Sequence, residues 1–167
     1  LLESYRAYRK KSENPHPLMF VGGEGWQQHE WKDELQDLVD SGAVRMQGYV
    51  SDFELPEIYR SAIGILLPSW YEGFGLPVLE AMAMGCPVIC SDNSSLSAVG
   101  GSAAIFINPK DPVSLTQAML GLESNPDLRE ELRVKGFEQE LKFSWERTAR
   151  LTLEFYDSVY QTWLKRT

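Results

Sequence analysis

Short apolar segments alternate with amphipathic ones along the chain, a pattern typical of parallel strands joined by crossover helices. Five segments are as short and apolar as strands covered on both faces, at residues 17–21, 44–47, 63–67, 87–90 and 104–107. Helical spacing of apolar residues predicts helices at residues 29–39, 53–62, 76–84, 97–99, 112–122, 126–142 and 145–164. The same spacing at Leu1, Leu2, Tyr5 and Tyr8 predicts an opening helix that a preceding strand should feed. We expect an α/β fold, with an open parallel sheet and helices on both of its faces.

Helix-capping signals support several of these boundaries. Ser51 and Glu54 have the spacing of a capping box. Asp111 and Asn125 each precede a proline, which suits the first position of a helix, and Ser144 precedes the last predicted helix.

Composition and charge exclude several classes of protein. With 167 residues, 43% of them apolar, the chain can bury the core of one domain, which excludes a disordered tail. The formal charge of -8 makes duplex nucleic acid an unfavourable partner, and no apolar run approaches the roughly 18 residues of a membrane-spanning helix. Because the sequence has neither an initiating Met nor a signal peptide, we expect a piece of a longer protein.

The cysteines and histidines predict no metal site and no disulfide. Cys86 and Cys90 would lie about 13 Å apart in one extended segment, too far to bridge. We expect both to pack as small apolar residues in a protein of a reducing compartment, with a reactive thiol as the alternative. His16 and His29 pair with no cysteine at a zinc-ligand spacing, so surface or capping roles are expected.

The chemistry concentrates in a loop that directly follows the predicted strand 63–67. The loop therefore lies at the carboxyl end of a parallel strand, where open α/β sheets bind ligands. Gly73 and Gly75 allow a tight turn and a close approach of the backbone to a ligand. The free amides near Phe74 to Val78 then form the positive end of a helix, which suits a phosphate.

Two carboxylates, Glu72 and Glu80, flank this turn. Glu80 is the only charged residue within 76–84, so we expect it to be buried, on the side of the helix that faces Glu72. Ionised carboxylates accept hydrogen bonds and suit the hydroxyls of a sugar, which leaves a phosphate to the amides. A buried structural hydrogen bond at Glu80 is the alternative.

The segment Pro68-Ser-Trp-Tyr-Glu-Gly-Phe-Gly-Leu-Pro-Val-Leu-Glu-Ala-Met-Ala-Met-Gly-Cys-Pro-Val88 places seven residues between Glu72 and Glu80. It resembles the signature of family 4 retaining glycosyltransferases. Similar residues extend the resemblance over nearly the whole chain, at Val21-Gly22-Gly23, Gly48-Tyr49-Val50, Ser94-Ser95-Leu96, Asn108-Pro109 and Phe143-Ser144-Trp145-Glu146. The family often has Pro-Glu where this chain has Ser97-Ala98, which leaves the contacts of that turn open.

The resemblance implies the Rossmann-like, C-terminal, nucleotide-sugar-binding lobe of a GT-B enzyme that transfers a hexose, such as mannose or glucose, from a UDP- or GDP-linked donor. It implies that Glu72 is the catalytic carboxylate at the transferred sugar and that Glu80 binds the ribose. The remaining implied donor contacts are Gly73, Phe74, Gly75 and Leu76 at the sugar and diphosphate, Tyr49, Val50 and Ser51 at the base, and Gly22 and Gly23 at the cleft wall. No metal or other cofactor is implied.

The resemblance further implies that residues 1–167 form a single donor-binding domain. Its last helix, residues 145–165, would dock on an N-terminal acceptor lobe of the same protein, and the aromatic residues of that helix would otherwise be core. The family's diphosphate-binding Arg and Lys precede the opening helix, so the isolated chain is expected to be inactive. Reduced cysteines and the cytosolic supply of donors favour the cytoplasm, with peripheral membrane attachment through the other lobe as a further possibility.

Two other functions stay open for the chain. One is a nucleotide-sugar epimerase or other GT-B relative, and the other is a non-catalytic sugar-binding module. Gly22-Gly23-Glu24-Gly25 lacks the spacing of a dinucleotide fingerprint, so NAD binding is not expected.

Overall fold

The computed structural model describes residues 1–23 and 32–165, and the side chains of residues 32–34 lie outside this description. The described strands are β1 (Leu18–Val21), β2 (Val44–Gly48), β3 (Ile65–Leu67), β4 (Val88–Ser91) and β5 (Ala104–Ile107). The described helices are α1 (Leu2–Lys11), α2 (Lys32–Asp40), α3 (Leu55–Ser61), α4 (Leu76–Ala83), α5 (Leu96–Gly100), α6 (Pro112–Ser124), α7 (Pro126–Glu140) and α8 (Trp145–Leu164). All predicted elements are present, although the predicted start of the second helix at His29 lies outside the described residues.

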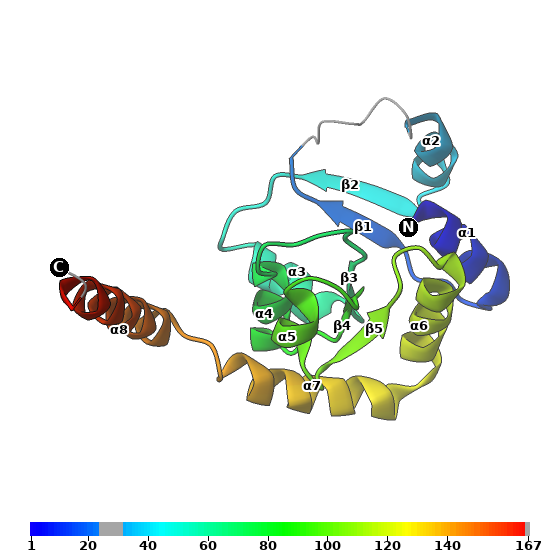
Figure 1. Ribbon diagram of the computed structural model, residues 1–167. Coiled ribbons are helices and arrows are strands. Elements are labelled where there is room, and N and C mark those ends of the chain that lie inside the picture. Colours follow the sequence, from blue (N-terminus) through cyan, green and yellow to red (C-terminus); the bar gives the residue numbers. More distant parts are fainter. Residues whose placement is uncertain (24–31, 166–167) are drawn as a thin grey trace.

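The strands are parallel, as predicted, but their hydrogen bonds divide them into two groups. One group is β1–β2 and the other is β3–β4–β5 (Figure 1). The two groups are connected through α1. On one side the buried Tyr5 hydroxyl donates to the Ala43 carbonyl oxygen at 2.7 Å and accepts from the Leu18 N–H at 3.1 Å. On the other side the Thr116 hydroxyl of α6 donates to the Ser4 carbonyl oxygen at 3.2 Å, and α6 packs with Ile89 and Ile107 of the β3–β4–β5 group. The predicted single sheet is therefore replaced by two parallel sheets in the described part of the chain.

Helices cover both faces of β4, which is buried along its whole length. Val88 and Cys90 pack in one hydrophobic cluster with residues of α4 and α5. Ile89 points the other way, because side chains alternate along a strand, and packs in a second cluster with residues of α1, α6 and α7. This arrangement confirms the predicted α/β class with helices on both faces.

The predicted helix caps are confirmed at three helices. The side chains of Asp111, Asn125 and Ser144 accept hydrogen bonds from backbone N–H groups in the first turns of α6, α7 and α8. At α3 the box is altered. Glu54 accepts from the Ser51 N–H at 3.2 Å, but the Ser51 hydroxyl donates to the same carboxylate instead of capping the helix.

The strands β1 and β2 differ from the prediction of strands covered on both faces. Met19, Val21 and Met46 are each more than a third exposed, whereas Val44 is buried. Their apolar composition predicted burial, but the described residues provide a cover for only part of this sheet.

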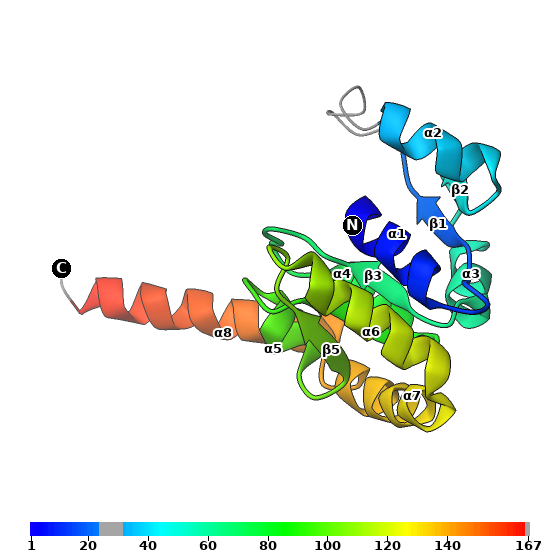
Figure 2. The ribbon, with the colours of Figure 1, turned by 90° about the vertical axis from the view of Figure 1, so that its right-hand side faces the viewer.

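The long helix α8 extends away from the rest of the molecule (Figures 1 and 2). None of its described residues is buried, and Trp145, Phe155, Tyr156, Tyr160 and Trp163 are each more than half exposed. The alternative that these aromatic residues belong to the core is therefore wrong. No helix in the described ranges is both long and apolar enough to cross a membrane.

Candidate functional site

The loop between β3 and α4 carries Glu72 at the carboxyl end of the central sheet, which consists of β3, β4 and β5. The Ser69 hydroxyl donates to Glu72 Oε1 at 2.8 Å. No described residue donates a hydrogen bond to the other carboxylate oxygen, Oε2. One oxygen of this half-buried carboxylate is thus oriented by the protein, and the other can accept from a ligand hydroxyl.

The turn ends at the N-terminus of α4, which lacks a side-chain cap from any residue in the described ranges. Gly75 is the N-cap residue and has a φ of 107°, a left-handed conformation that favours glycine. A Cβ at this position would also lie 2.8 Å from Leu96 Cδ2, so any other residue would force the buried Leu96 side chain to shift. The first turn holds no acidic residue. A helix N-terminus of this kind carries a partial positive charge, and the binding of an anion to it stays a prediction.

Phe74 and Leu76 flank this helix end with side chains that are 44% and 45% exposed. Phe74 packs edge-on against Phe143, with 6.0 Å between the ring centroids. Two residues before Glu72, Trp70 is exposed on the same loop, and Lys110 lies 5.9 Å from its ring centroid. The loop is therefore held by contacts with segments that follow β5 and α7.

Glu80 is exposed, so the prediction that it is buried was wrong. The helix α4 buries Val78, Ala81 and Met82 and turns Leu76 and Glu80 outward. Apolar residues lie on both faces of this helix, which is why composition predicted burial for all of it. The alternative of a buried structural hydrogen bond is wrong for the same reason.

A hydroxyl from α3 contacts the Glu80 carboxylate. The Tyr59 hydroxyl donates to Glu80 Oε2 at 3.1 Å. Burial, and then the negative charge of Glu80, raise the pKa of Tyr59 above its ordinary value, so this hydroxyl stays protonated as a donor. Glu80 thus keeps one oxygen on Tyr59 while the rest of the carboxylate faces solvent.

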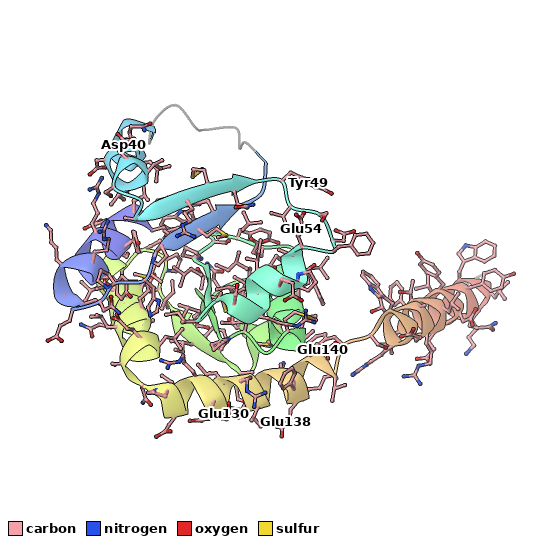
Figure 3. All side chains as sticks on the ribbon, turned by 180° about the vertical axis from the view of Figure 1, so that it is seen from behind. Asp40, Tyr49, Glu54, Glu130, Glu138 and Glu140 are labelled. Atoms are coloured by element: carbon pink, nitrogen blue, oxygen red, sulfur yellow. The ribbon has the colours of Figure 1, made fainter. Side chains whose placement is uncertain are left out.

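The other predicted contacts lie at the ends of β1 and β2. The Gly22 N–H donates to the Gly48 carbonyl oxygen at 2.8 Å, which brings the turn after β1 beside the turn after β2. Gly22 and Gly23 are exposed, Tyr49 is 83% exposed, and Val50 and Ser51 are half-buried. Figure 3 shows Tyr49 at the end of β2, on the connection that leads to Glu54. Glu24 and Gly25 of the predicted loop lie outside the described residues.

Sequence reasoning missed the contacts that hold the Glu72 loop. Asn93, Ser94 and Ser95, which follow β4, hydrogen-bond to the backbone of residues 69–72. The signals in the sequence were their polar character, their place after a buried strand and, for Ser94 and Ser95, their place in the family resemblance. Ser97 and Ala98 occupy the positions where the family often has Pro-Glu. The Ser97 hydroxyl donates to Asp92 Oδ1 at 2.8 Å, so it is bonded within the segment that follows β4.

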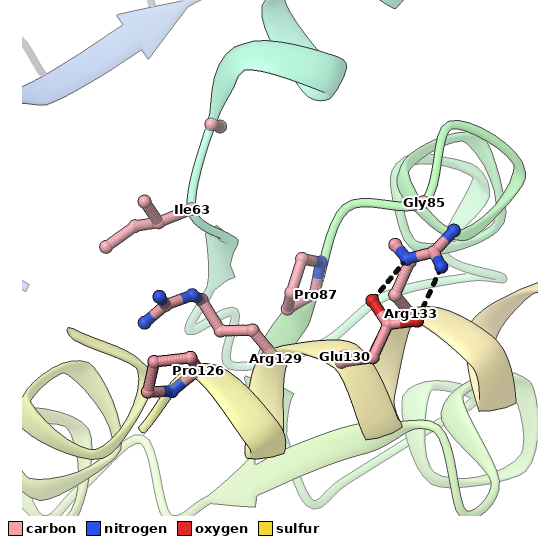
Figure 4. Close-up of a pocket in the computed structure, with 8 residues that line it drawn as sticks. Ile63, Gly85, Pro87, Pro126, Arg129, Glu130 and Arg133 are labelled. Carbon is pink, nitrogen blue, oxygen red and sulfur yellow. Dashed lines mark hydrogen bonds and ion pairs between the residues drawn. The ribbon is translucent and has the colours of Figure 1, made fainter. Parts of the chain in front are cut away.

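A depression of about 270 Å³ lies at the opposite end of the central sheet. Ile63 and Pro87, which line it, precede β3 and β4, so it lies at the amino ends of these strands (Figure 4). Arg133 pairs with Glu130 there, and Arg129 donates to the carbonyl oxygens of Leu122 and Glu123. Both guanidinium groups are engaged by the protein, so we do not assign the functional site to this depression.

The two cysteines are packed as predicted. Cys86 and Cys90 are free and buried, and burial raises the pKa of each thiol to about 12. They therefore pack as apolar residues, and the alternative of a reactive thiol is not supported. His16 is exposed, whereas His29 lies outside the described residues. No cluster of three or more metal-ligating side chains was found among the residues that the structure describes.

Comparison with known proteins decides the family. The family described as "Glycosyl transferases group 1" matches residues 1–139. The chain belongs to this family. Its α/β fold is that of a Rossmann-like lobe of GT-B glycosyltransferases, as the sequence predicted.

The relatives and solved structures agree with this assignment. The O-antigen chain mannosyltransferase B of Escherichia coli is 36% identical over 160 residues, which cover 93% of this chain and 41% of that protein. A D-inositol 3-phosphate glycosyltransferase of Nocardioides sp. is 35% identical over 115 residues, which cover 68% of this chain and 25% of that protein. The sucrose-phosphate synthase of Thermosynechococcus elongatus superposes with a TM-score of 0.80 at 25% identity, over 96% of this chain and 42% of that structure.

This chain is also similar to the solved structure of an isolated C-terminal domain, most of which it covers. The C-terminal domain of a glycosyl transferase group 1 family protein from Francisella tularensis has a TM-score of 0.72 at 24% identity, over 84% of this chain and 75% of that domain. This chain therefore spans less than half the length of the E. coli relative and most of an isolated C-terminal domain.

Proposed function

We propose that this chain is the nucleotide-sugar-binding half of a retaining glycosyltransferase that transfers a hexose from a UDP- or GDP-linked donor. The observation that carries the proposal is the turn from Glu72 to Gly75, in which a carboxylate with one open oxygen adjoins the uncapped N-terminus of α4. A sugar diphosphate needs both hydrogen-bond acceptors for its hydroxyls and a positive seat for its anion. Mannose is the first sugar to test, because the E. coli relative is named a mannosyltransferase.

Each predicted residue has a role in this proposal. Glu72 accepts a hydroxyl of the transferred sugar and is the catalytic carboxylate, while Glu80 accepts the ribose hydroxyls with the carboxylate oxygens that face solvent. The backbone at Gly73, Phe74, Gly75 and Leu76 holds the sugar and the diphosphate. The base and the wall of the cleft are assigned to Tyr49, Val50, Ser51, Gly22 and Gly23.

Catalysis in this scheme is electrostatic. Charge develops on the diphosphate as the sugar–phosphate bond breaks, and amides that already point at that position stabilise it without moving. The sugar keeps its anomeric configuration, and no resident metal is required. The basic side chains that complete this stabilisation, and the groups that bind the acceptor, are proposed to lie outside residues 1–167.

The arrangement of the whole protein is part of the proposal. Residues 1–167 are the donor-binding domain, and the helix at residues 145–165 docks on an N-terminal acceptor lobe. The chain alone is then inactive, because acceptor and diphosphate contacts are incomplete. We place the protein in the cytoplasm, where nucleotide sugars are supplied, with peripheral membrane attachment through the other lobe.

The deciding experiment assays sugar transfer by the full-length protein from UDP-, GDP- and ADP-linked hexoses, with anomeric analysis of the product. A transfer rate that falls to a low but measurable level in Glu72→Ala, while the affinity for free nucleoside diphosphate is kept, supports the assignment of Glu72 to the sugar. Glu131→Ala, an exposed carboxylate on α7 that pairs with Lys135, is the matched control. Activity that survives alanine at both Glu72 and Glu80 would reject the scheme, and an epimerised nucleotide sugar as the product would favour the epimerase alternative.

A further inference from the structure

The loop that carries Glu72 is fastened to the loop that follows β4. The Asn93 side-chain amide donates to the carbonyl oxygens of Ser69 at 3.2 Å and of Trp70 at 3.0 Å. These contacts join segments that lie more than twenty residues apart in the chain. They hold the backbone of the β3–α4 loop on the side that leads into Glu72.

Both polar groups of the Glu72 backbone are held by neighbouring serines. The Glu72 N–H donates to Ser94 Oγ at 3.2 Å, and the Ser95 hydroxyl donates to the Glu72 carbonyl oxygen at 3.0 Å. Two contacts on opposite sides of one residue restrict its φ and ψ together, so the direction of its Cα–Cβ bond is set by Ser94 and Ser95.

Ser94 makes its contact with Glu72 from a strained backbone conformation. Its φ is 50°, and it is the only non-glycine residue with a positive φ in the described ranges. A serine in this region is strained by about 1 kcal/mol or more, and such strain persists only where the surroundings impose it. The Ser94 hydroxyl donates to Asn93 Oδ1 at 3.2 Å, so Asn93, Ser94 and Glu72 form one connected network.

We propose that Asn93, Ser94 and Ser95 are positioning residues that aim the Glu72 carboxylate at the transferred sugar. This inference rests on the proposed function of Glu72. The three residues act through the Glu72 backbone, while the Ser69 hydroxyl orients one carboxylate oxygen. Because transfer depends on the geometry of the reacting groups, a small displacement of Glu72 lowers turnover much more than it weakens the binding of the nucleotide.

A double-mutant cycle of Ser95→Ala and Glu72→Ala in the full-length protein tests the proposal, with the nucleotide sugar that supports transfer. Ser95→Ala is expected to lower kcat about tenfold while the Kd for the free nucleoside diphosphate stays unchanged. In the Glu72→Ala background the same change is expected to have no further effect, since its target is already removed. Ser95→Thr, which keeps the hydroxyl, is expected to restore most of the lost turnover.

Ser97→Ala is the matched control. It removes a hydroxyl two residues away that donates to Asp92 and not to the Glu72 loop, so kcat is expected to stay within about twofold of the parent. If Ser95→Ala does not fold, Ser94→Gly replaces it in the cycle, because glycine accepts the positive φ and removes the hydroxyl together with its Cβ.

The possible failures are distinguishable. An equal loss of kcat from Ser95→Ala with and without Glu72, or no loss at all, overturns the positioning proposal and leaves the proposed function intact. An unchanged kcat in Glu72→Ala alone, or the absence of transfer from every donor, overturns the proposed function and this inference with it.

Discussion

The contact between Tyr59 and Glu80 shows how one residue controls the chemistry of another in this site. The Tyr59 hydroxyl is kept protonated by burial and by the adjacent carboxylate, so it is a permanent donor to Glu80 Oε2. A carboxylate with one oxygen engaged presents the other in a defined direction. At the residue scale, the orientation of the exposed Glu80 side chain is therefore set from α3.

We predict that Glu80→Ala weakens nucleotide binding while leaving the fold intact. The exposed side chain contributes less than about 1 kcal/mol to the free energy of unfolding, whereas loss of charged hydrogen bonds to ribose lowers the affinity for UDP or GDP by about tenfold or more. Calorimetric titration and denaturant unfolding measure the two effects. Glu57→Ala, an exposed carboxylate of α3 that pairs with Arg60, is the control. Unchanged affinity combined with lost stability would assign Glu80 a structural role instead.

We also predict that Cys86 and Cys90 are inert in the folded protein. With the pKa of both thiols raised to about 12, they stay protonated at pH 8 and do not react with iodoacetamide until the chain unfolds, as mass spectrometry would show. The stability associated with the protonated thiols is fully present below the pKa of an unfolded cysteine and is lost as the pH rises towards 12. Rapid alkylation of the native protein at pH 8 would contradict this.

At the scale of the element, α7 and α8 begin with the same kind of cap but differ in what they contact. The helix α7 packs on α4, where the buried Gly136 lets Met82 approach so closely that an added Cβ would lie 3.3 Å from its Cγ. Gln139 of α7 donates to the Val99 carbonyl oxygen at 2.9 Å. The helix α8 has no buried residue within its described length. The same local signal therefore starts one helix of the core and one helix that stands apart from it.

The two caps are predicted to differ in their effect on global stability. Asn125→Ala removes the acceptor for the Leu128 N–H and is expected to lower the free energy of unfolding by about 1 kcal/mol. Ser144→Ala is expected to leave that free energy unchanged and to increase hydrogen exchange only in the first turn of α8, because this helix is not coupled to the core. Equal destabilisation by both variants in denaturant unfolding would show that α8 is coupled to the core.

At the scale of the whole molecule, α8 projects from a body built by the other elements (Figure 2). Its exposed aromatic and aliphatic side chains, among them Trp145 and Trp163, form a larger apolar surface than solvated helices normally carry. The proposed N-terminal lobe would cover this surface. The body itself depends on α7 for the packing of α4 and on α1 for the link between the two sheets.

Truncation is predicted to separate these two parts. Removing all residues from Trp145 onward is expected to change the free energy of unfolding by less than about 1 kcal/mol, since only exposed side chains are lost. Removing all residues from Pro126 onward is expected to abolish folding, because Leu132, Gly136 and Gln139 of α7 are buried. Circular dichroism and thermal unfolding of the two truncated chains measure this. If the chain that lacks only the residues from Trp145 onward is unfolded, α8 is part of the folded body.

The sequence by itself determined the order and type of the elements, the caps at Asp111, Asn125 and Ser144, and the turn that ends at Gly75. These features depend on residues a few positions apart, so the local sequence contains the groups that interact. The family signature named the candidate carboxylates for the same reason, since it is a continuous segment of the chain.

Only the tertiary structure decided which faces of these elements are covered. Glu80 is exposed, although its apolar neighbours predicted burial, and α8 is exposed where core was one of two expectations. The strands divide into two sheets, although their alternation with helices predicted one. Composition shows that a side chain can be buried, but burial also needs a partner surface from elsewhere in the chain. The hydrogen bonds of Ser94 and Ser95 with the Glu72 backbone could not be predicted from the sequence either, because these residues come together only when β3 and β4 pair.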